Sequence, residues 1–405
     1  MTQAARLRAT LSLATLVMLG LSWPLWVKTG TEPEAFPRVP FVFGPAALSA
    51  SGSRAVFASL LLSIATAGAG IAWRRMLALS LALLLVLIAG DQHRFQPWVY
   101  QYLMVGLMLA SQSPARGLRY ARGWYLATYL HSGLSKLDGP FCREMGLLFL
   151  ATAVRPLGVD PTDWPIGWRN AAVLAMPAGE IVVALALAWP RSRRLGLLGA
   201  SALHVALIAI LGPLGLRHST ILLVWNAAML AEVWLAFGPV HGEPDPSPYP
   251  FPWLGRLARG LFWVAVVLPI SERWGWLDAW PSHALYASHG ERTEVWLHES
   301  ELSAYPPEVR RHVRRVGDGP WHRLDLTGWS REVRGVPVYP QGRACNGLAE
   351  ALAARYGEHR LIRVVQWSRT DPWTGQRRRV ECQGREAIQR QGDRYRLNAH
   401  PFGTP

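Results

Sequence analysis

The stretch YLHSGLSKLDGPF (129–141) sets a histidine, a lysine and an aspartate beside an apolar run. Its lysine is unusual, because only Lys136 and Lys28 are lysines among the 42 basic residues of the chain. Arginine keeps its proton at physiological pH, whereas a desolvated lysine releases its proton readily and can then act as a base or nucleophile. Lys136 is therefore the first candidate for chemistry. The alternative is a lysine at a helix end that extends to the membrane interface near Asp138.

The residues before Lys136 have the spacing of a helix face. Tyr129 and Ser132 share the face of Lys136, and Gly133 allows close approach of a neighbouring helix or a ligand. Ionisable groups inside membrane spans are costly and mark pathways or sites. The others in or beside apolar runs are Asp91, His93, Arg94, His131, Glu180, His204, Glu232 and Glu272.

Each of these residues also has a structural interpretation. Asp91, His93 and Arg94 stand at the edge of a run, where they can face head groups. His204 is typical of a hydrogen-bonded packing residue. Glu232 is close enough to the end of its run to extend to the interface. Glu180 is in the middle of a run that Pro177 loosens, which favours a functional role. No HExxH or paired ExxH spacing occurs, so we expect no metal site.

Elements that could position these residues follow from the apolar runs. Nine runs are long enough to be candidates for membrane spans. They are 8–27, 55–73, 76–90, 98–112, 123–137, 171–189, 195–214, 219–238 and 260–279. A tenth run, 146–154, is too short to cross and is typical of a re-entrant or interfacial segment. The fold class is mainly α, with a multi-span transmembrane domain (1–281) followed by a soluble α+β domain (282–405).

Basic residues predict the orientation in the cell membrane. Alternate loops carry the clusters Arg6 and Arg8; Arg74 and Arg75; Arg116, Arg119 and Arg122; Arg191, Arg193 and Arg194; Arg256 and Arg259. The positive-inside rule places these loops and the N-terminus in the cytoplasm. Nine crossings then place the C-terminal domain on the non-cytoplasmic side. We expect Asp91, Arg94 and Lys136 to converge on one cavity open to that side.

The C-terminal domain shows short elements and no catalytic motif. TEVWLH (293–298) and LIRVVQW (361–367) predict strands, and PPEVRRHV (306–313) and NGLAEALAARYG (346–357) predict helices. RTDPWTGQRRRVEC (369–382) predicts a hairpin around DPWTG. Cys345 and Cys382 share this domain, and an external location permits a bond between them.

The net charge of +15 is a further constraint on partners. Arginine-rich composition and attraction to anionic lipid head groups account for it, so the partner is the bilayer and we expect no nucleic acid.

The segment 129–138 also resembles a motif of a known protein family. YLHSGLSKLD is similar to the Y-x-x-[AS]-G-[VL]-x-K-L-D segment of vitamin K-dependent γ-carboxylases and the wider HTTM membrane proteins. The match is carried by Tyr129, Ser132, Gly133, Leu134, Lys136, Leu137 and Asp138. A second segment, DQHRFQPWVYQYL (91–103), resembles an earlier polar segment of that family. The likeness covers about residues 1–280.

The resemblance implies a role for Lys136. In the carboxylases the matching lysine deprotonates a reduced quinone, oxygen then yields a strong base, and carbon dioxide adds to a glutamate. The family's activating histidine falls near Trp98 here, so His93 and His131 are the candidates to replace it as catalytic residues. The expected substrate-binding residues are Asp91, Arg94, Trp98, Tyr129, Ser132, Asp138 and Glu180.

Three functions remain open at this point. The first is an enzyme that acts on a membrane quinone or lipid with Lys136 as base, and a reduced quinone is its implied cofactor. The second is a membrane protein of the DoxX or MauE kind, which supports redox metabolism without turnover of its own. The third is a transporter, although the two halves show no repeat of the kind typical of transporters. No protein partner is predicted.

Overall fold

The computed structural model describes residues 1–27, 36–42, 49–239, 252–356 and 361–402. Lys28 and most of the Pro-rich loop expected at 238–252 lie outside these residues. The described chain is mainly helical. Its long helices are α1 (Gln3–Leu21), α3 (Ala50–Ala69), α4 (Trp73–Ala89), α5 (Pro97–Ser111), α6 (Pro114–Leu134), α9 (Ile166–Ala188), α10 (Arg193–Leu211), α11 (Thr220–Phe237) and α12 (Pro252–Val267). Short helices are α2 (Trp23–Trp26), α7 (Gly139–Arg143), α8 (Met145–Val154), and the 3-10 segments η1 (Gln92–Arg94) and η4 (Leu268–Trp274).

Each of the nine apolar runs lies on one of these helices, but nine crossings are not confirmed. Six helical segments in the described residues are long and apolar enough to cross a membrane. They are Gln3–Leu21, Ala50–Ala69, Ile166–Ala188, Arg193–Leu211, Thr220–Phe237 and Trp253–Trp274. Of the other three, α4 and α5 have 17 and 15 residues, and α6 carries three arginines along its 21 residues. The short run 146–154 forms α8, a helix of 10 residues.

The chain forms two compact units, and each is assembled from separate pieces of sequence. The first unit contains 1–18, 61–81 and 97–289, and the second contains 19–60, 82–96 and 290–405. The last piece of the second unit begins at Gly290, close to the predicted boundary at 281/282.

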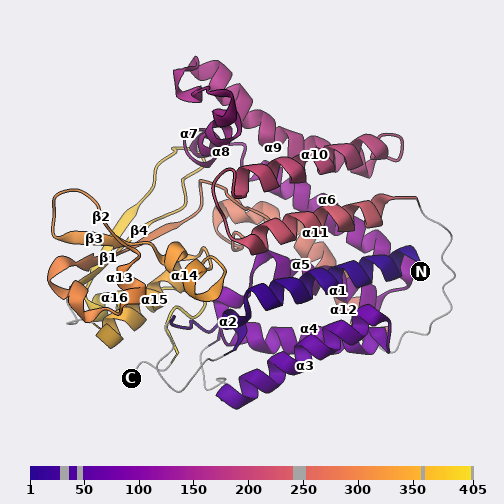
Figure 1. The fold of residues 1–405 in the computed structure, drawn as a ribbon, viewed down its shortest axis with the longest axis horizontal. Helices are drawn as coiled ribbons and strands as arrows, with labels where there is room; N and C mark the ends of the chain where they lie inside the picture. Colours follow the sequence, from indigo (N-terminus) through magenta and orange to yellow (C-terminus); the bar gives the residue numbers. More distant parts are fainter. Residues whose placement is uncertain (28–35, 43–48, 240–251, 357–360, 403–405) are drawn as a thin grey trace. The chain divides into compact units, whose positions relative to one another are not determined.

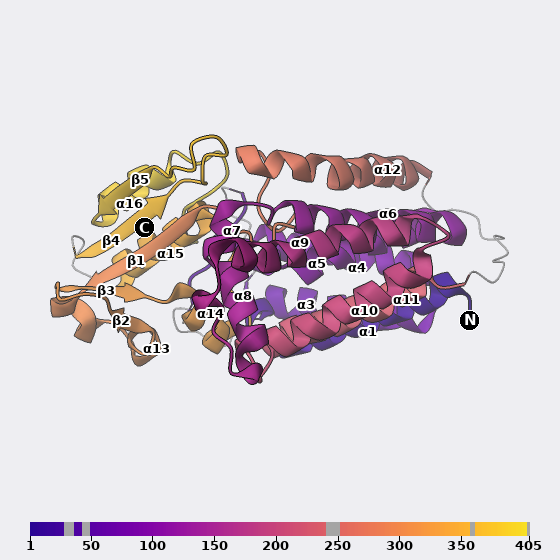
Figure 2. The same ribbon diagram turned by 90° about the horizontal axis from the view of Figure 1, so that it is seen from above.

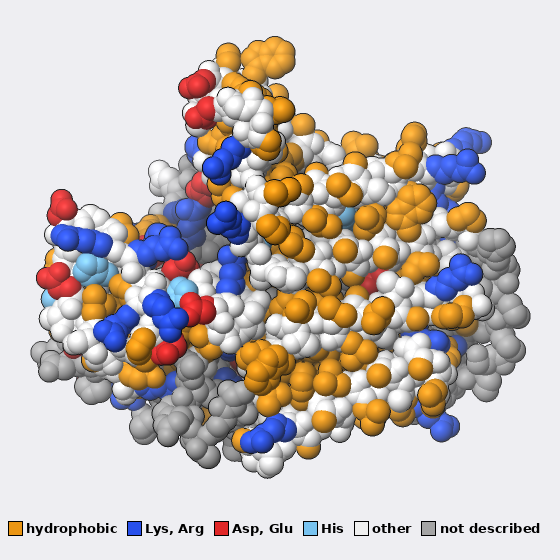
Figure 3. Space-filling view, viewed as in Figure 1, with side chains coloured by type: hydrophobic (Ala, Val, Ile, Leu, Met, Phe, Trp, Pro, Cys, Tyr) orange, Lys and Arg blue, Asp and Glu red, His pale blue; other side chains and the backbone are white. Residues whose placement is uncertain are grey.

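In the first unit, α6 packs between α5 and α9, and α10 packs against both α9 and α11 (Figures 1 and 2). The outward faces of α9 and α10 carry exposed apolar residues such as Val182, Leu185, Leu198 and Val205. Figure 3 shows apolar side chains spread over the helical part of the visible face. Such surfaces suit lipid rather than water, because a helix in hydrocarbon satisfies its own backbone and exposes apolar side chains.

The second unit contains a five-stranded antiparallel sheet in the order β2-β3-β1-β4-β5. Its strands are β1 (Arg292–His298), β2 (Val313–Arg315), β3 (Trp321–Leu324), β4 (Ile362–Trp367) and β5 (Arg379–Gln383), and its helices are α13 (Pro307–Arg310), α14 (Leu326–Arg334), α15 (Gly342–Tyr356) and α16 (Arg385–Gly392). Alternate residues of β1, Val295 and Leu297, are fully buried, as the period of a half-buried strand requires. They pack against α15 and against Phe36 and Val39 from an early part of the chain.

The short C-terminal motifs are largely confirmed. The predicted strands 293–298 and 361–367 are β1 and β4, and the predicted helix 346–357 corresponds to α15 from Asn346 to its end at Tyr356. The predicted hairpin joins β4 to β5, where the Gly375 N–H donates to the Asp371 carbonyl at 2.9 Å. The helix expected at 306–313 is shorter, because it ends at Arg310 and the chain continues into β2.

Candidate functional site

Lys136 lies just past the C-terminal end of α6. The last carbonyls of a helix have no intrahelical donor, and a basic side chain there can satisfy them. The Lys136 Nζ donates to the Ser132 carbonyl at 2.9 Å and to the Ser132 Oγ at 2.7 Å. Its side chain is 6% exposed, so Lys136 is held inside the protein.

The counter-ion of Lys136 is Glu180 on α9. The ammonium lies 2.9 Å from Oε1 and 2.8 Å from Oε2 of Glu180, whose side chain is 12% exposed. Three N–H donors therefore face four oxygen atoms, and the pair is enclosed and fully hydrogen-bonded. A buried pair of this geometry stabilises both charges, and removing either partner would leave the other uncompensated.

Gly133 brings the two helices close enough for this pair. A Cβ at Gly133 would lie 2.7 Å from the Pro177 carbonyl oxygen and 2.7 Å from Cγ1 of Ile181. Any larger residue would therefore push α9 away from α6. The expected close approach at Gly133 is made by a helix, and Pro177 lies at this contact within α9.

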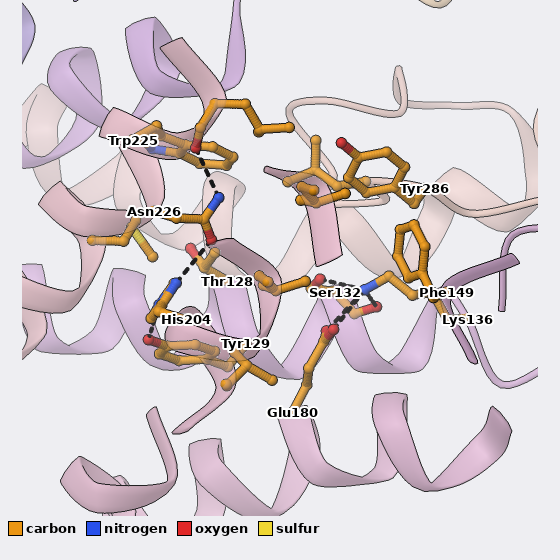
Figure 4. A pocket seen from close by; sticks show the side chains of 16 residues that line it. Thr128, Tyr129, Ser132, Lys136, Phe149, Glu180, His204, Trp225, Asn226 and Tyr286 are labelled. Carbon is orange, nitrogen blue, oxygen red and sulfur yellow. Dashed lines mark hydrogen bonds and ion pairs between the residues drawn. The ribbon is translucent and has the colours of Figure 1, made fainter. Parts of the chain in front are cut away.

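The Lys136–Glu180 pair lines a cavity of about 70 Å³ in the first unit (Figure 4). Its polar lining comes from Thr128, Tyr129, Ser132, Lys136, Glu180, His204 and Asn226. Its apolar lining includes Phe149, Leu203, Leu207, Leu211, Leu222, Met229 and Leu285. The lining thus combines a few charged and polar groups with apolar side chains, which is the usual composition of a small-molecule site.

A chain of hydrogen bonds links three of the polar lining residues. The Tyr129 hydroxyl is 2.8 Å from Nε2 of His204, and Nδ1 of His204 is 3.0 Å from Oδ1 of Asn226. The Asn226 amide donates to the Leu222 carbonyl at 2.8 Å, so its oxygen faces His204 as an acceptor. Nδ1 of His204 therefore donates to Oδ1 of Asn226, and Nε2 forms the hydrogen bond with the Tyr129 hydroxyl.

The sequence located only part of this site. Tyr129, Ser132, Lys136 and Glu180 line the same cavity, but the roles of His204 and Asn226 were not recognised. They come from α10 and α11, and no local spacing links them to Lys136. The available signal was a polar residue inside each of two largely apolar runs.

His131 does not line this cavity. Its Nε2 is 2.7 Å from the Val266 carbonyl oxygen of α12, and its ring stacks on that of His283 with a centroid distance of 6.5 Å. Trp98 is buried on α5 and is also absent from the described cavity lining.

Asp138 belongs to a separate cluster of charges. Its Oδ1 accepts the Phe141 N–H at 2.8 Å and so caps α7, while its Oδ2 is 2.6 Å from Nη1 of Arg273 and 2.9 Å from Nδ1 of His289. The other ring nitrogen of His289 is 2.8 Å from Oε2 of Glu272. His289 thus bridges two carboxylates with a side chain that is 1% exposed.

This cluster makes stability depend on pH. Burial opposes the charged forms of His289 and Asp138. Hydrogen bonds to Asp138 and Glu272 nevertheless raise the pKa of His289 above its usual 6.5. Hydrogen bonds from His289 and Arg273 outweigh burial at Asp138 and lower its pKa to about 2. The stability that His289 contributes is fully present below its unfolded pKa and is lost as pH rises through its folded pKa. The stability that Asp138 contributes is lost in the opposite direction, as pH falls from 3.8 to about 2.

We therefore expect the unfolding temperature to fall as pH is raised from about 6.5, the ordinary pKa of histidine, to about 9. Thermal unfolding in detergent at several pH values measures this slope. The His289→Gln variant should be less stable at pH 6 and should lose the slope attributed to His289. An equal slope in the variant and the parent protein would assign the pH dependence to another group.

Asp91, His93 and Arg94 lie in the second unit. Asp91 is 3.1 Å from Nη1 of Arg334, and its Oδ1 accepts the His93 N–H that begins η1. Burial raises the pKa of Asp91, but the charges of Arg334 and other cations outweigh it and leave the pKa lowered. Arg94 donates to the carbonyls of Leu25, Leu87 and Trp26 at 3.0, 2.8 and 3.2 Å. These contacts fix the backbone at the ends of α2 and α4.

His93 is likewise held by the backbone. Its Nδ1 accepts the Tyr339 N–H at 3.0 Å, and burial lowers its pKa to about 3, so the ring is neutral. The neighbouring Gln92 accepts from Nε of Arg343 at 2.9 Å. Each residue of the segment 91–94 thus has a structural partner, although the buried Nε2 of His93 has none among the described residues. Its convergence with Lys136 on one cavity stays a prediction.

The cysteines are unpaired. Cys142, Cys345 and Cys382 are free thiols, so the bond considered between Cys345 and Cys382 is not formed. Both nevertheless contact the same apolar core of the second unit. Burial raises the pKa of Cys345 to about 12, which makes its thiol unreactive.

The chain was also compared with known proteins. No family model, curated protein or solved structure matches it.

Proposed function

We propose that this chain is a multi-span membrane protein of the HTTM and γ-carboxylase-like kind, and that it performs acid–base chemistry on a membrane quinone or lipid. The observation that supports this is the buried Lys136–Glu180 pair in a cavity lined by both polar and apolar side chains. Ionisable groups placed inside a membrane protein at this cost are usually functional.

The geometry supports a shared proton rather than a lysine that acts alone. The Lys136 ammonium and the Glu180 carboxylate form an ion pair at 2.8 Å. Transfer of one proton from Nζ to a Glu180 oxygen gives a neutral amine beside a neutral acid, with no net change of charge. The amine can then take a proton from a substrate hydroxyl. Arginine could not do this, because guanidinium keeps its proton.

The size of the cavity limits what enters it. About 70 Å³ accommodates a few waters, whereas a benzene-sized ring occupies an engineered cavity of about 150 Å³. A quinone head group therefore requires wall residues to move apart. Phe149 and Tyr286 are suited to this, because their rings meet edge to face at 5.2 Å and Tyr286 has a left-handed backbone with φ of 61°.

Extraction of the purified protein and mass spectrometry of the lipids it retains tests the substrate class. We expect a quinone or a lipid with an acidic hydroxyl in the parent protein, and much less of it in a Ser132→Trp variant, which fills the cavity. A matched Ser201→Trp variant on α10 should retain the compound, because Ser201 does not line the cavity. Identical lipid profiles in all three proteins would contradict a site at Lys136.

We also propose nine crossings, with the N-terminus in the cytoplasm and residues 282–405 on the non-cytoplasmic side. The five basic loops support this orientation. A reporter fused after Pro405 should be active only when exported, and activity confined to the cytoplasm would contradict it.

A further inference from the structure

Glu232 is a buried carboxyl that the proposed chemistry does not use. It lies five residues before the end of α11, about 7.5 Å along the helix, so a route to the interface was expected. Instead its side chain turns inward, and the residue is 0% exposed. Its Oε2 accepts the Tyr125 hydroxyl at 2.7 Å and the Gln101 amide N–H.

No cation in the described chain forms an ion pair with Glu232. The nearest arginine along α6 is Arg122, which donates to the Ala236 carbonyl one turn further along α11. On α10, both ring nitrogens of His204 are bound to Tyr129 and Asn226. Both partners of Glu232 are uncharged, so an ionised carboxylate would be buried without compensation. Such a group takes up a proton instead.

The second carboxyl oxygen is unoccupied. Oε1 of Glu232 is buried and has no hydrogen-bond partner among the described residues. In the protonated acid the proton is on Oε1, and Oε2 accepts hydrogen bonds from Tyr125 and Gln101. The arrangement of donors around Glu232 therefore fits the neutral acid.

Two connections lead from Glu232 toward the Lys136 cavity. Gln101 binds Glu232 and accepts from Nε1 of Trp225 at 2.7 Å, and Trp225 lines the cavity. Tyr125 is one turn before Tyr129 on the same face of α6, and Tyr129 also lines the cavity. Hydroxyl groups can pass protons, whereas the amide and indole groups serve to fix positions.

We propose that Glu232 is a second proton-binding site of the bundle and that it exchanges its proton with the cavity along the Tyr125–Tyr129 face of α6. The neutral Glu232 would thus hold one proton beside the pair at Lys136 and Glu180. This assignment does not depend on the identity of the substrate.

Infrared spectroscopy of the full-length protein in lipid nanodiscs tests it. We expect Glu232→Gln to remove a carboxylic acid C=O band, and the matched Glu180→Gln variant to keep that band and remove a carboxylate band. Because Gln replaces a neutral acid at nearly the same size, the Glu232→Gln variant should unfold at the parent temperature. Loss of a carboxylate band in Glu232→Gln would overturn the proposal.

Isotope exchange and chemical labelling test the remaining parts. In D₂O the acid band should shift, and Tyr125→Phe should slow the shift; an unchanged rate would contradict the α6 route.

A hydrophobic carbodiimide adds across its C=N bond to a protonated carboxyl and leaves the whole reagent attached after rearrangement to an N-acylurea. We expect the adduct on Glu232 by peptide mass spectrometry, and an adduct on Glu180 alone would contradict the assignment. Neither readout requires turnover, so the proposed function can fail while this proposal stands.

Discussion

Replacing Lys136 with methionine should lower the free energy of unfolding by about 3–5 kcal/mol, because it leaves the Glu180 carboxylate buried without its counter-ion. The double variant, with both Lys136 and Glu180 changed to methionine, should recover most of this loss. Removing both charges also removes the cost of desolvating them, and an apolar pair of similar volume is often as stable as the ions it replaces. Unfolding of the four proteins in one detergent, analysed as a double-mutant cycle, gives the coupling energy.

An exposed pair provides the control. Arg390 and Glu386 are 3.9 Å apart on α16 with side chains that are 72% and 89% exposed. The same cycle there should give a coupling energy below about 1 kcal/mol. If the effects at Lys136 and Glu180 simply add, the two residues do not form the pair described above.

The Lys136→Arg variant should fold normally and lose turnover by about 10²–10⁴-fold, the range that general acid–base catalysis contributes. Guanidinium can still bind both oxygens of Glu180, so the ion pair and its stabilisation remain. It cannot pass a proton to Glu180, so no neutral amine forms. The assay follows the compound that the purified protein retains, under conditions that saturate the site.

Two further variants separate chemistry from packing. Lys136→Ala should be equally inactive, and a small external amine should restore part of its turnover. Ser132→Ala removes one acceptor of the ammonium and should cost much less activity than Lys136→Arg. Full turnover by Lys136→Arg would reduce Lys136 to a structural counter-ion of Glu180.

The sequence pattern predicted an element well where the apolar periodicity of that element alone identifies it. Every apolar run proved helical, and the alternation around Val295 and Leu297 identified β1. Strands β2 and β3 were missed, because Val313–Arg315 and Trp321–Leu324 are short, polar and only partly buried. Strand β3 is placed by its pairing with β1, and β2 by its pairing with β3, which no local pattern records.

Apart from Glu180, the site was predictable only along one helix. The face shared by Tyr129, Ser132 and Lys136 follows from helical spacing, whereas Asn226 reaches the cavity through the packing of α11. The polar segment 91–94 shows the opposite limit. Its charges suggested a site, but Arg334 and Tyr339, which bind Asp91 and His93, come from more than 240 residues later in the chain.

The mixed origin of the second unit has a consequence for biosynthesis. Phe36 and Val39 share one core with β1 and α15, so this core cannot close until the C-terminal residues have been made. About 350 residues separate Phe36 from Ile388, which belongs to the same core, and at about 5–20 residues per second their synthesis takes roughly 20–70 seconds. During that time the early segment must wait without its partners. A fragment that begins at residue 282 would lack Phe36, Val39 and Gln92, so the C-terminal region depends on the early chain for a complete core and is not a transferable module.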